Sequence, residues 1–201
     1  MAPALTPSQA ALVRLSAAIA AGGPADVKSA ASEAIEVGVE TAALYEILLQ
    51  SYLFVGFPRA IEAFFAAGPV LAGAGALPTA ASIDPERWRR DGESLCHQVY
   101  GKNYEKLMAT MRGLSPDLAS WMILEGYGKT LSRPALGPAE REYAVVAILT
   151  ATRMWRQLRS HAIGAVNVGG TRAGVREAIL LAEPWSGTAV VQEALAMSGL
   201  A

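Results

Sequence analysis

The chain carries an internal self-similarity that limits its fold more than any single motif does. When the sequence is shifted by 131 positions, residues 5–68 align with residues 136–199 without a gap. The aligned identities at expected helix boundaries and turns are Pro7 with Pro138, Gly38 with Gly169, and Gly56 with Gly187, and Glu46 aligns with Glu177 within an expected helix. This placement predicts one four-helix unit used twice, with the two copies burying their apolar faces against each other.

The expected fold class is all-α. Apolar residues recur at spacings of three and four, and the alternation typical of strands is absent from the sequence. Proline in the first helical turn marks four helix starts: Thr6-Pro7, Asp84-Pro85, Ser115-Pro116 and Gly137-Pro138. Thr6 and Gln9 have the spacing of a capping box. Gly38 and Gly169 stand where helices should end in left-handed turns.

A stretch rich in glycine, alanine and proline divides the chain. Residues 66–85 lack periodicity and indicate a linker. We expect an N-terminal repeat over 1–68, a linker over 69–85 and a C-terminal unit over 86–201, which together can pack as one domain.

Composition excludes several classes of function. The net charge is −1 without a basic run, which argues against nucleic acid as a partner. The N-terminus lacks a basic region and no apolar run reaches the ~18 residues of a membrane span, so a soluble cytoplasmic protein is expected. Charged residues are 17% and apolar residues 52% of the chain, which favours surface hidden in a homo-oligomer.

Two stretches of the C-terminal half, "YGKTLSRPALGPAEREYAVVAILTA" and "QLRSHAIGAVNVGGTRAGVREAIL", resemble the carboxymuconolactone decarboxylase family. The N-terminal "YEILLQSYLFVGFPRAIEAF" is similar to the end of the same unit. The resemblance implies an all-helical, oligomeric fold of the alkylhydroperoxidase D type. Two kinds of enzyme share it: decarboxylases of carboxylated lactones, and peroxidases. It also implies that a duplicated chain forms a trimer.

The peroxidases carry a Glu, two Cys and a His at a fixed spacing, which here falls on Glu142, Met154, Gln157 and His161. Both cysteines are replaced, and neither methionine nor glutamine can act as a peroxidatic thiolate. The decarboxylases keep the Glu and the His without needing cysteines, so the sequence is closer to that branch. In the N-terminal copy the two positions fall on alanines, Ala11 and Ala30. One site per chain is therefore expected.

The expected chemistry is cofactor-independent decarboxylation of a small carboxylated lactone. His161 would donate a proton to carbon, and Glu142 would orient the imidazole and stabilise its charged form, which requires partial solvent access. Arginines suit the binding of carboxylates, and the candidates are Arg133, Arg153, Arg156 and Arg159. Tyr127 can line the pocket if its hydroxyl finds a partner. The sequence shows no recognisable metal-ligand spacing.

Two other functions stay open. One is a peroxidase-like activity through Cys96, the single cysteine, which is adjacent to His97 but is expected to be a buried small hydrophobe. The other is a non-catalytic protein that binds a small acid or serves in assembly.

Overall fold

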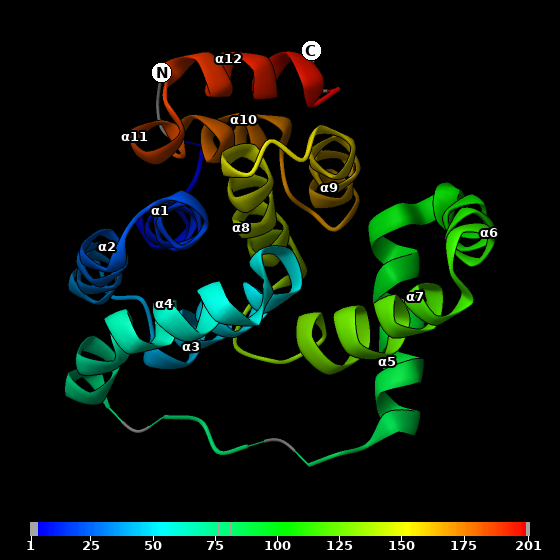
Figure 1. Ribbon diagram of the computed structural model, residues 1–201, viewed down its shortest axis with the longest axis horizontal. Helices are drawn as coiled ribbons and strands as arrows, with labels where there is room; N and C mark the ends of the chain where they lie inside the picture. The colour runs from blue at the N-terminus through cyan, green and yellow to red at the C-terminus, as the bar shows by residue number, and fades with distance from the viewer. Residues whose placement is uncertain (1–3, 76, 81, 200–201) are drawn as a thin grey trace.

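The protein is a bundle of helices. The computed structural model describes residues 4–75, 77–80 and 82–199, and every regular element in these ranges is helical, which confirms the all-α class (Figure 1). The elements are α1 Pro7–Ala21, α2 Pro24–Glu36, α3 Thr41–Gln50, α4 Tyr52–Ala74, α5 Pro85–Tyr100, the 3₁₀-helix η1 Gly101–Asn103, α6 Tyr104–Leu114, α7 Pro116–Trp121, the π-helix η2 Met122–Leu131, α8 Pro138–Ala151, α9 Trp155–Asn167, α10 Arg172–Leu180, α11 Glu183–Ser186 and α12 Thr188–Met197.

The four helix starts marked by proline are confirmed. α1, α5, α7 and α8 each begin at the expected proline. At α1 the capping box forms, because the Gln9 N–H donates to Thr6 Oγ1 at 3.2 Å and the Thr6 N–H donates to Gln9 Oε1 at 3.0 Å. Gly38 and Gly169 have φ angles of 86° and 98°, the left-handed conformation expected after a helix end.

Two central helices, α1 and α8, pack against each other and join the halves of the chain (Figure 1). One buried cluster combines Val13 and Ala17 of α1 with Val146 of α8 and with apolar residues of α9, α10 and α12. A second cluster gathers the apolar faces of α1–α4 and includes Ala144 of α8. The core therefore runs across both halves.

A separate group of helices, α5, α6, α7 and η2, lies at one side of the bundle (green in Figure 1). Within it, α5 and η2 touch at the backbone level: a Cβ added to Gly92 would lie 2.2 Å from the Ile123 carbonyl oxygen, and one added to Gly128 would lie 1.8 Å from that of Trp88. Only glycine permits this approach. The pairing fixes the position of η2 against α5, and both elements border the site described below.

α4 departs from the sequence expectations in two ways. It continues through Ala74, so the first six residues of the expected 69–85 linker are helical. By length and composition it is also the one helix in the described ranges that could cross a membrane, although the sequence predicts no apolar run of that length. Gly56, with φ 77°, interrupts it, and Arg59 donates from Nε to the Ile19 carbonyl oxygen at 2.6 Å. Its buried alanines pack with the cluster of α1–α3, so α4 is tied into the bundle.

The two ends of the chain show corresponding helix boundaries. α8, α9 and α10 begin 131 positions after α1, α2 and α3, respectively. Gly187, before α12, has φ 82°, close to the 77° of Gly56 in α4.

Candidate functional site

Glu142 and His161 form a buried pair between neighbouring helices. Glu142 begins the second turn of α8, His161 lies in the second turn of α9, and Nδ1 of the imidazole is 2.8 Å from Oε2 of the carboxylate. A carboxylate can only accept, so Nδ1–H donates and Nε2 stays available for a ligand. His161 is 7% and Glu142 3% exposed. The pair is thus more enclosed than the partial solvent access expected from the sequence.

A glycine lets a third helix close over this pair. Gly164 of α9 is so near to α5 that an added Cβ would lie 2.6 Å from Val99 Cγ1 and 3.2 Å from Glu142 Oε2. On the same side, the Asn167 amide donates to the Val99 carbonyl oxygen at 2.8 Å. The end of α5 is therefore held against α9, at the glycine that also borders Glu142.

Cys96 and Tyr100 of α5, with Tyr127 of η2, form the wall that faces Glu142. Cys96 is fully buried, as expected, and Tyr127 is 4% exposed. The two tyrosine rings meet edge to face, with centroids 6.3 Å apart. Burial and then the negative charge of Glu142 raise the pKa of Cys96 to about 12. Burial raises the pKa of Tyr100 to about 12, although the neighbouring Tyr127 hydroxyl works in the other direction. Burial also raises the pKa of Tyr127 well above its usual value, with smaller contributions from Tyr100 and Glu142.

The N-terminal half contributes one aromatic side chain to the pair. Phe54, near the start of α4, stands edge to face against the His161 imidazole, with ring centroids 5.8 Å apart and an interplanar angle of 85°. The π-electrons of an aromatic face and the polarised hydrogens of a ring edge attract in this geometry. Phe54 therefore helps to hold the imidazole in place.

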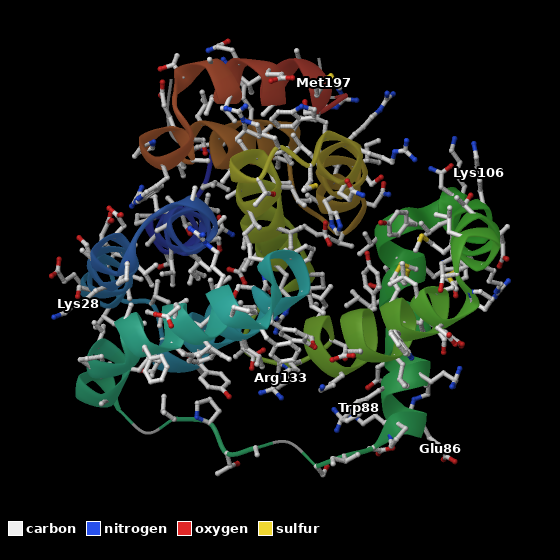
Figure 2. The ribbon with its side chains drawn as sticks, viewed as in Figure 1. Lys28, Glu86, Trp88, Lys106, Arg133 and Met197 are labelled. Atoms are coloured by element: carbon white, nitrogen blue, oxygen red, sulfur yellow. The ribbon has the colours of Figure 1, made fainter. Side chains whose placement is uncertain are left out.

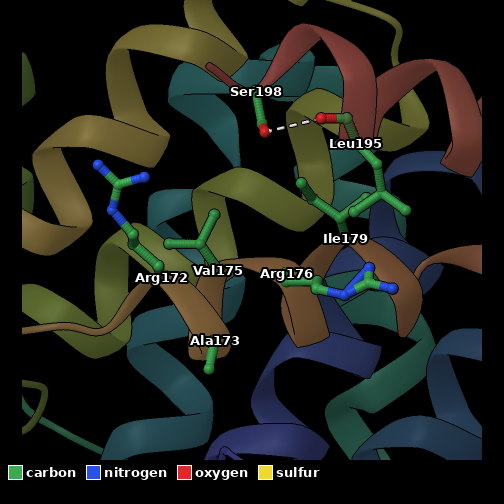
Figure 3. A pocket seen from close by; sticks show the side chains of 7 residues that line it. All are labelled: Arg172, Ala173, Val175, Arg176, Ile179, Leu195 and Ser198. Atoms are coloured by element: carbon green, nitrogen blue, oxygen red, sulfur yellow. Dashed lines mark hydrogen bonds between the residues drawn. The ribbon is translucent and has the colours of Figure 1, made fainter. Parts of the chain in front are cut away.

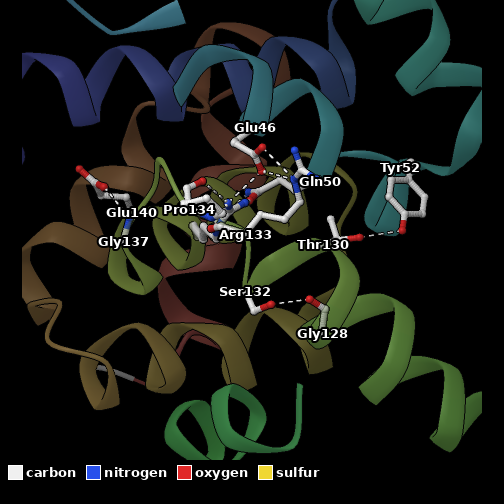
Figure 4. Close-up of polar contacts among 11 residues, drawn as sticks. Glu46, Gln50, Tyr52, Gly128, Thr130, Ser132, Arg133, Pro134, Gly137 and Glu140 are labelled. Atoms are coloured by element: carbon white, nitrogen blue, oxygen red, sulfur yellow. Dashed lines mark hydrogen bonds and ion pairs between the residues drawn. The ribbon is translucent and has the colours of Figure 1, made fainter. Parts of the chain in front are cut away.

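Of the five residues expected to bind substrate, the structure brings only Tyr127 close to the Glu142–His161 pair. Arg133 donates from Nε to both Glu46 carboxylate oxygens, at 2.9 and 3.1 Å (Figure 4). Arg141, 2% exposed, donates to the same Glu46 at 2.9 Å and to Gln50 Oε1 at 2.9 Å. Burial lowers the pKa of Arg141, and Glu46 counteracts this.

Arg133 also borders a cavity of about 480 Å³, together with Trp88 of α5 and Lys129 of η2. Arg133 and Trp88 are labelled in Figure 2. Among the contacts of the described residues, none joins Arg133 to Glu142 or His161. Arg153, with φ 56°, lies in the turn before α9, Arg156 lies in its first turn and Arg159 in its second. All three are exposed.

Another cavity, of about 360 Å³, lies between α10 and α12 and is lined by Arg172, Arg176 and Ser198 (Figure 3). Neither this cavity nor the one at Arg133 includes Glu142 or His161 in its lining. Within residues 4–75, 77–80 and 82–199, no three His, Cys, Asp or Glu side chains are grouped so that they could hold a metal ion.

The sequence did not predict Phe54 and Tyr100 as residues of the site. Tyr100 follows Cys96 by four positions, so both lie on one face of α5. That face could have been read from the sequence, but its approach to Glu142 depends on tertiary packing. Phe54 aligns with Trp185 in the 131-position shift. A large aromatic residue at the same position of both copies was the signal that could have pointed to Phe54.

These features define an all-helical protein with one buried carboxylate–imidazole pair, enclosed by aromatic side chains. Residues 116–198 match the model of the carboxymuconolactone decarboxylase family. The chain is also similar to "Peroxisomal protein 2" of Schizosaccharomyces pombe, with 31% identity over 179 residues, which covers 87% of this chain and 84% of that protein. The chain belongs to the carboxymuconolactone decarboxylase family.

Proposed function

We propose that the chain is a cofactor-independent decarboxylase of a small carboxylated lactone, with Glu142 and His161 as its acid–base pair. The observation that carries the proposal is the 2.8 Å hydrogen bond between Glu142 Oε2 and His161 Nδ1 in a buried site. The bond fixes the ring and directs Nε2 away from Glu142.

The proposed reaction breaks one carbon–carbon bond. The substrate carboxylate leaves as CO₂, and the electron pair of the broken bond moves into the lactone carbonyl to form an enolate. Nε2–H of the His161 imidazolium then donates its proton to carbon, and the imidazole regains a proton from solvent. A positioned acid of this kind contributes ~10² to 10⁴ in rate. The carboxylate of Glu142, 2.8 Å from Nδ1, stabilises the imidazolium and opposes the cost of burying its charge.

Arg153 and Arg156 remain our candidates for binding the substrate carboxylate, because both are exposed near the start of α9. Tyr127 belongs to the site wall. Arg133 would first have to exchange its Glu46 partner for the substrate, so it ranks below the other two arginines.

The test is incubation of the purified protein with carboxymuconolactone, with CO₂ release and loss of the lactone as readouts. We expect release of one CO₂ per lactone consumed. If the lactone stabilises the protein against heat but no product forms, the protein is a binding protein. If it is neither bound nor consumed, this substrate class is wrong.

A peroxidase-like activity through Cys96 has less support. With a pKa of about 12, the thiol is ionised in only about one molecule in 10⁵ at pH 7. Cys96 is also completely buried. Hydroperoxide consumption equal in wild type and Cys96→Ser would exclude this cysteine.

We also propose that the two halves arose as copies of one four-helix unit. Reciprocal contacts support this. Glu46 of α3 holds Arg133, which precedes α8, and Glu177 of α10 accepts from the Leu5 N–H, which precedes α1, at 3.0 Å. Exchanged contacts of this kind are what a two-fold relation produces. In the first copy, Ala11 and Ala30 are buried at the positions of Glu142 and His161, which supports one site per chain.

For assembly we propose a homotrimer, with α4 in the interface. Phe57, Ile61 and Phe65 recur every four residues along α4 and are 61%, 49% and 74% exposed. Such a stripe is typical of a surface that a partner covers. Light scattering should give three times the chain mass, and a monomer would contradict the proposal.

The cytoplasmic location remains a proposal. The name of the fission yeast relative supports a peroxisomal location as the alternative. Fluorescence microscopy of the tagged chain in its own host, with a peroxisomal marker, distinguishes the two.

A further inference from the structure

The cavity of about 480 Å³ at Arg133 is a second place where this chain can hold a small molecule. It lies between α3, the start of α5, η2 and the turn that follows η2, and the linker after α4 borders it (Figure 1). Its volume falls within the roughly 300–1,000 Å³ of pockets that bind small ligands. Glu142 and His161 are not among the residues that line it. The cavity is therefore separate from the carboxylate–imidazole pair.

Arg133 is held at this cavity by two buried residues. Its Nε donates to both carboxylate oxygens of Glu46, and its carbonyl oxygen accepts from Arg141 Nη2 at 2.8 Å. These contacts fix the guanidinium before any ligand arrives. Among the described residues, no hydrogen bond uses the terminal nitrogens of Arg133, Nη1 and Nη2. To bind a ligand in this cavity, Arg133 does not have to leave Glu46.

Two further cations line the same cavity. They are Lys129 of η2 and Arg87 of α5. Lys129 Nζ lies 3.3 Å from Glu125 and Arg87 Nε lies 3.2 Å from Asp91, and both cations are exposed to solvent. Exposed pairs of this kind are weak, so either cation can turn to an anionic ligand.

The two carboxylates in the lining are already neutralised. Glu46 is shared by Arg133 and Arg141. Asp84 caps α5, where its Oδ1 accepts from the Arg87 N–H at 3.0 Å beside the positive end of the helix. The cavity therefore favours an anion over a cation.

An aromatic side chain adds an apolar surface beside these charges. Trp88 is half-buried and lines the cavity, and Lys129 Nζ lies 5.9 Å from the centroid of its ring. A planar ring packs well on an indole, and a carboxylate matches the two terminal nitrogens of a guanidinium. These features together suit an acid carried on a ring.

We propose that this cavity binds a small aromatic carboxylate, with the carboxylate on Nη1 and Nη2 of Arg133 and the ring against Trp88. Lys129 contributes a second positive charge. The site uses neither Glu142 nor His161, so the inference goes beyond the proposed function and does not depend on turnover.

The first experiment locates a probe by nuclear magnetic resonance. Benzoate is titrated into the ¹⁵N-labelled protein, and the indole N–H signals of the four tryptophans are followed. The signal of Trp88 is assigned by its loss in Trp88→Phe. We expect benzoate to shift this signal saturably, in the millimolar range, and to leave the other three in place. Benzamide, which has the same shape without the charge, should bind more weakly.

The second experiment removes the paired donors of the guanidinium. Arg133→Lys keeps the charge and a partner for Glu46, and we expect it to weaken benzoate binding ~10-fold. Arg176→Lys is the matched control, because Arg176 is exposed on α10 and lines the other cavity. Neither this control nor His161→Ala should change the affinity. Thermal melting checks that each variant folds, and Ala42→Leu, which narrows the cavity without touching Arg133, should also weaken binding.

Three results overturn the proposal. The first is a Trp88 signal that does not move with benzoate. The second is equal affinity in Arg133→Lys and Arg176→Lys, or, should Arg133→Lys fail to fold, equal affinity in Ala42→Leu and the wild type. The third is binding lost in His161→Ala but kept in Arg133→Lys, which would place benzoate at the Glu142–His161 pair. Because none of these readouts uses turnover, the failure of this site leaves the proposed function standing.

Discussion

Nδ1 of His161 and Oε2 of Glu142 lie 2.8 Å apart, on neighbouring helices, at positions nineteen residues apart in the sequence. The carboxylate binds Nδ1 of the ring and thereby leaves Nε2 for the substrate. The nineteen-residue spacing of the two residues is visible in the sequence. Their burial depends on the fold, because α5, η2 and α4 pack around them.

Glu142→Gln should lower kcat by ~10 to 10² while the protein stays folded. The amide keeps the size of the side chain but removes the charge that stabilises the imidazolium. Steady-state kinetics on carboxymuconolactone measures the effect. Glu125→Gln is the matched control, since Glu125 pairs with Lys129 on the exposed side of η2. Equal losses in the two variants would show that the charge of Glu142 has no special part.

Glu46→Gln should lower the free energy of unfolding. Glu46 is 3% exposed and pairs with both Arg133 and Arg141. Removing one partner from a buried ion pair costs about 3–5 kcal/mol. Urea denaturation should show a loss in this range. Glu33→Gln, which breaks a half-exposed pair with Arg14, should cost less, about 1 kcal/mol. A Glu46 variant as stable as the Glu33 variant would contradict the structural role assigned to this network.

Gly164→Ala should push α5 away from the pair. The new methyl group would lie 2.6 Å from Val99 Cγ1, and overpacking of this kind costs about 1–3 kcal/mol. We expect a lower free energy of unfolding together with lower turnover. Gly113→Ala is the control: a Cβ there meets no atom within 4 Å, and alanine is favoured over glycine within a helix by up to about 1 kcal/mol. If both variants are stabilised, α5 does not approach α9 as closely as described.

The free energy of unfolding should fall as the pH rises above 9, and Cys96 should contribute to this fall between pH 9 and 10. Its pKa is raised from 9.0 to about 12 in the folded chain, so the unfolded chain loses the proton first. The stabilisation is complete below pH 9 and is lost as the pH rises towards 12. Near pH 10 the loss from this group is about 1.4 kcal/mol, because one unit of pKa is worth 1.36 kcal/mol. Tyr52 and Tyr100 add to the loss above pH 10.

Cys96→Ser measures this contribution. Urea denaturation at pH 8, 9 and 10 should show a shallower dependence on pH for the variant than for the wild type. Parallel curves would mean that the thiol titrates alike in the folded and unfolded chains, and the assigned burial of Cys96 would then be wrong.

Local signals in the sequence predicted the helices well. Pro7, Pro138 and Thr6 act within one helical turn, so their effect does not depend on the rest of the fold. The linker was less predictable, because Pro69 lies inside α4 and the helix continues past it. Whether a helix continues past a proline of this kind depends on tertiary packing.

For the site, the sequence predicted the Glu142–His161 pair through its spacing but not the wall around it. Tyr100 and Phe54 come from segments far from His161 in the chain. Arg133 was expected to bind substrate, but its partner Glu46 lies 87 positions away and could not be foreseen. Long-range pairing of this kind leaves no periodic pattern in one sequence.

The most direct measurement compares the two histidines of the chain. His97 is exposed on α5 and stacks against Tyr104, whereas His161 is buried with Glu142. Turnover of carboxymuconolactone should fall by at least ~10² in His161→Ala and stay at the wild-type rate in His97→Ala. Equal turnover by the wild type and His161→Ala would contradict the assignment of His161 as the proton donor.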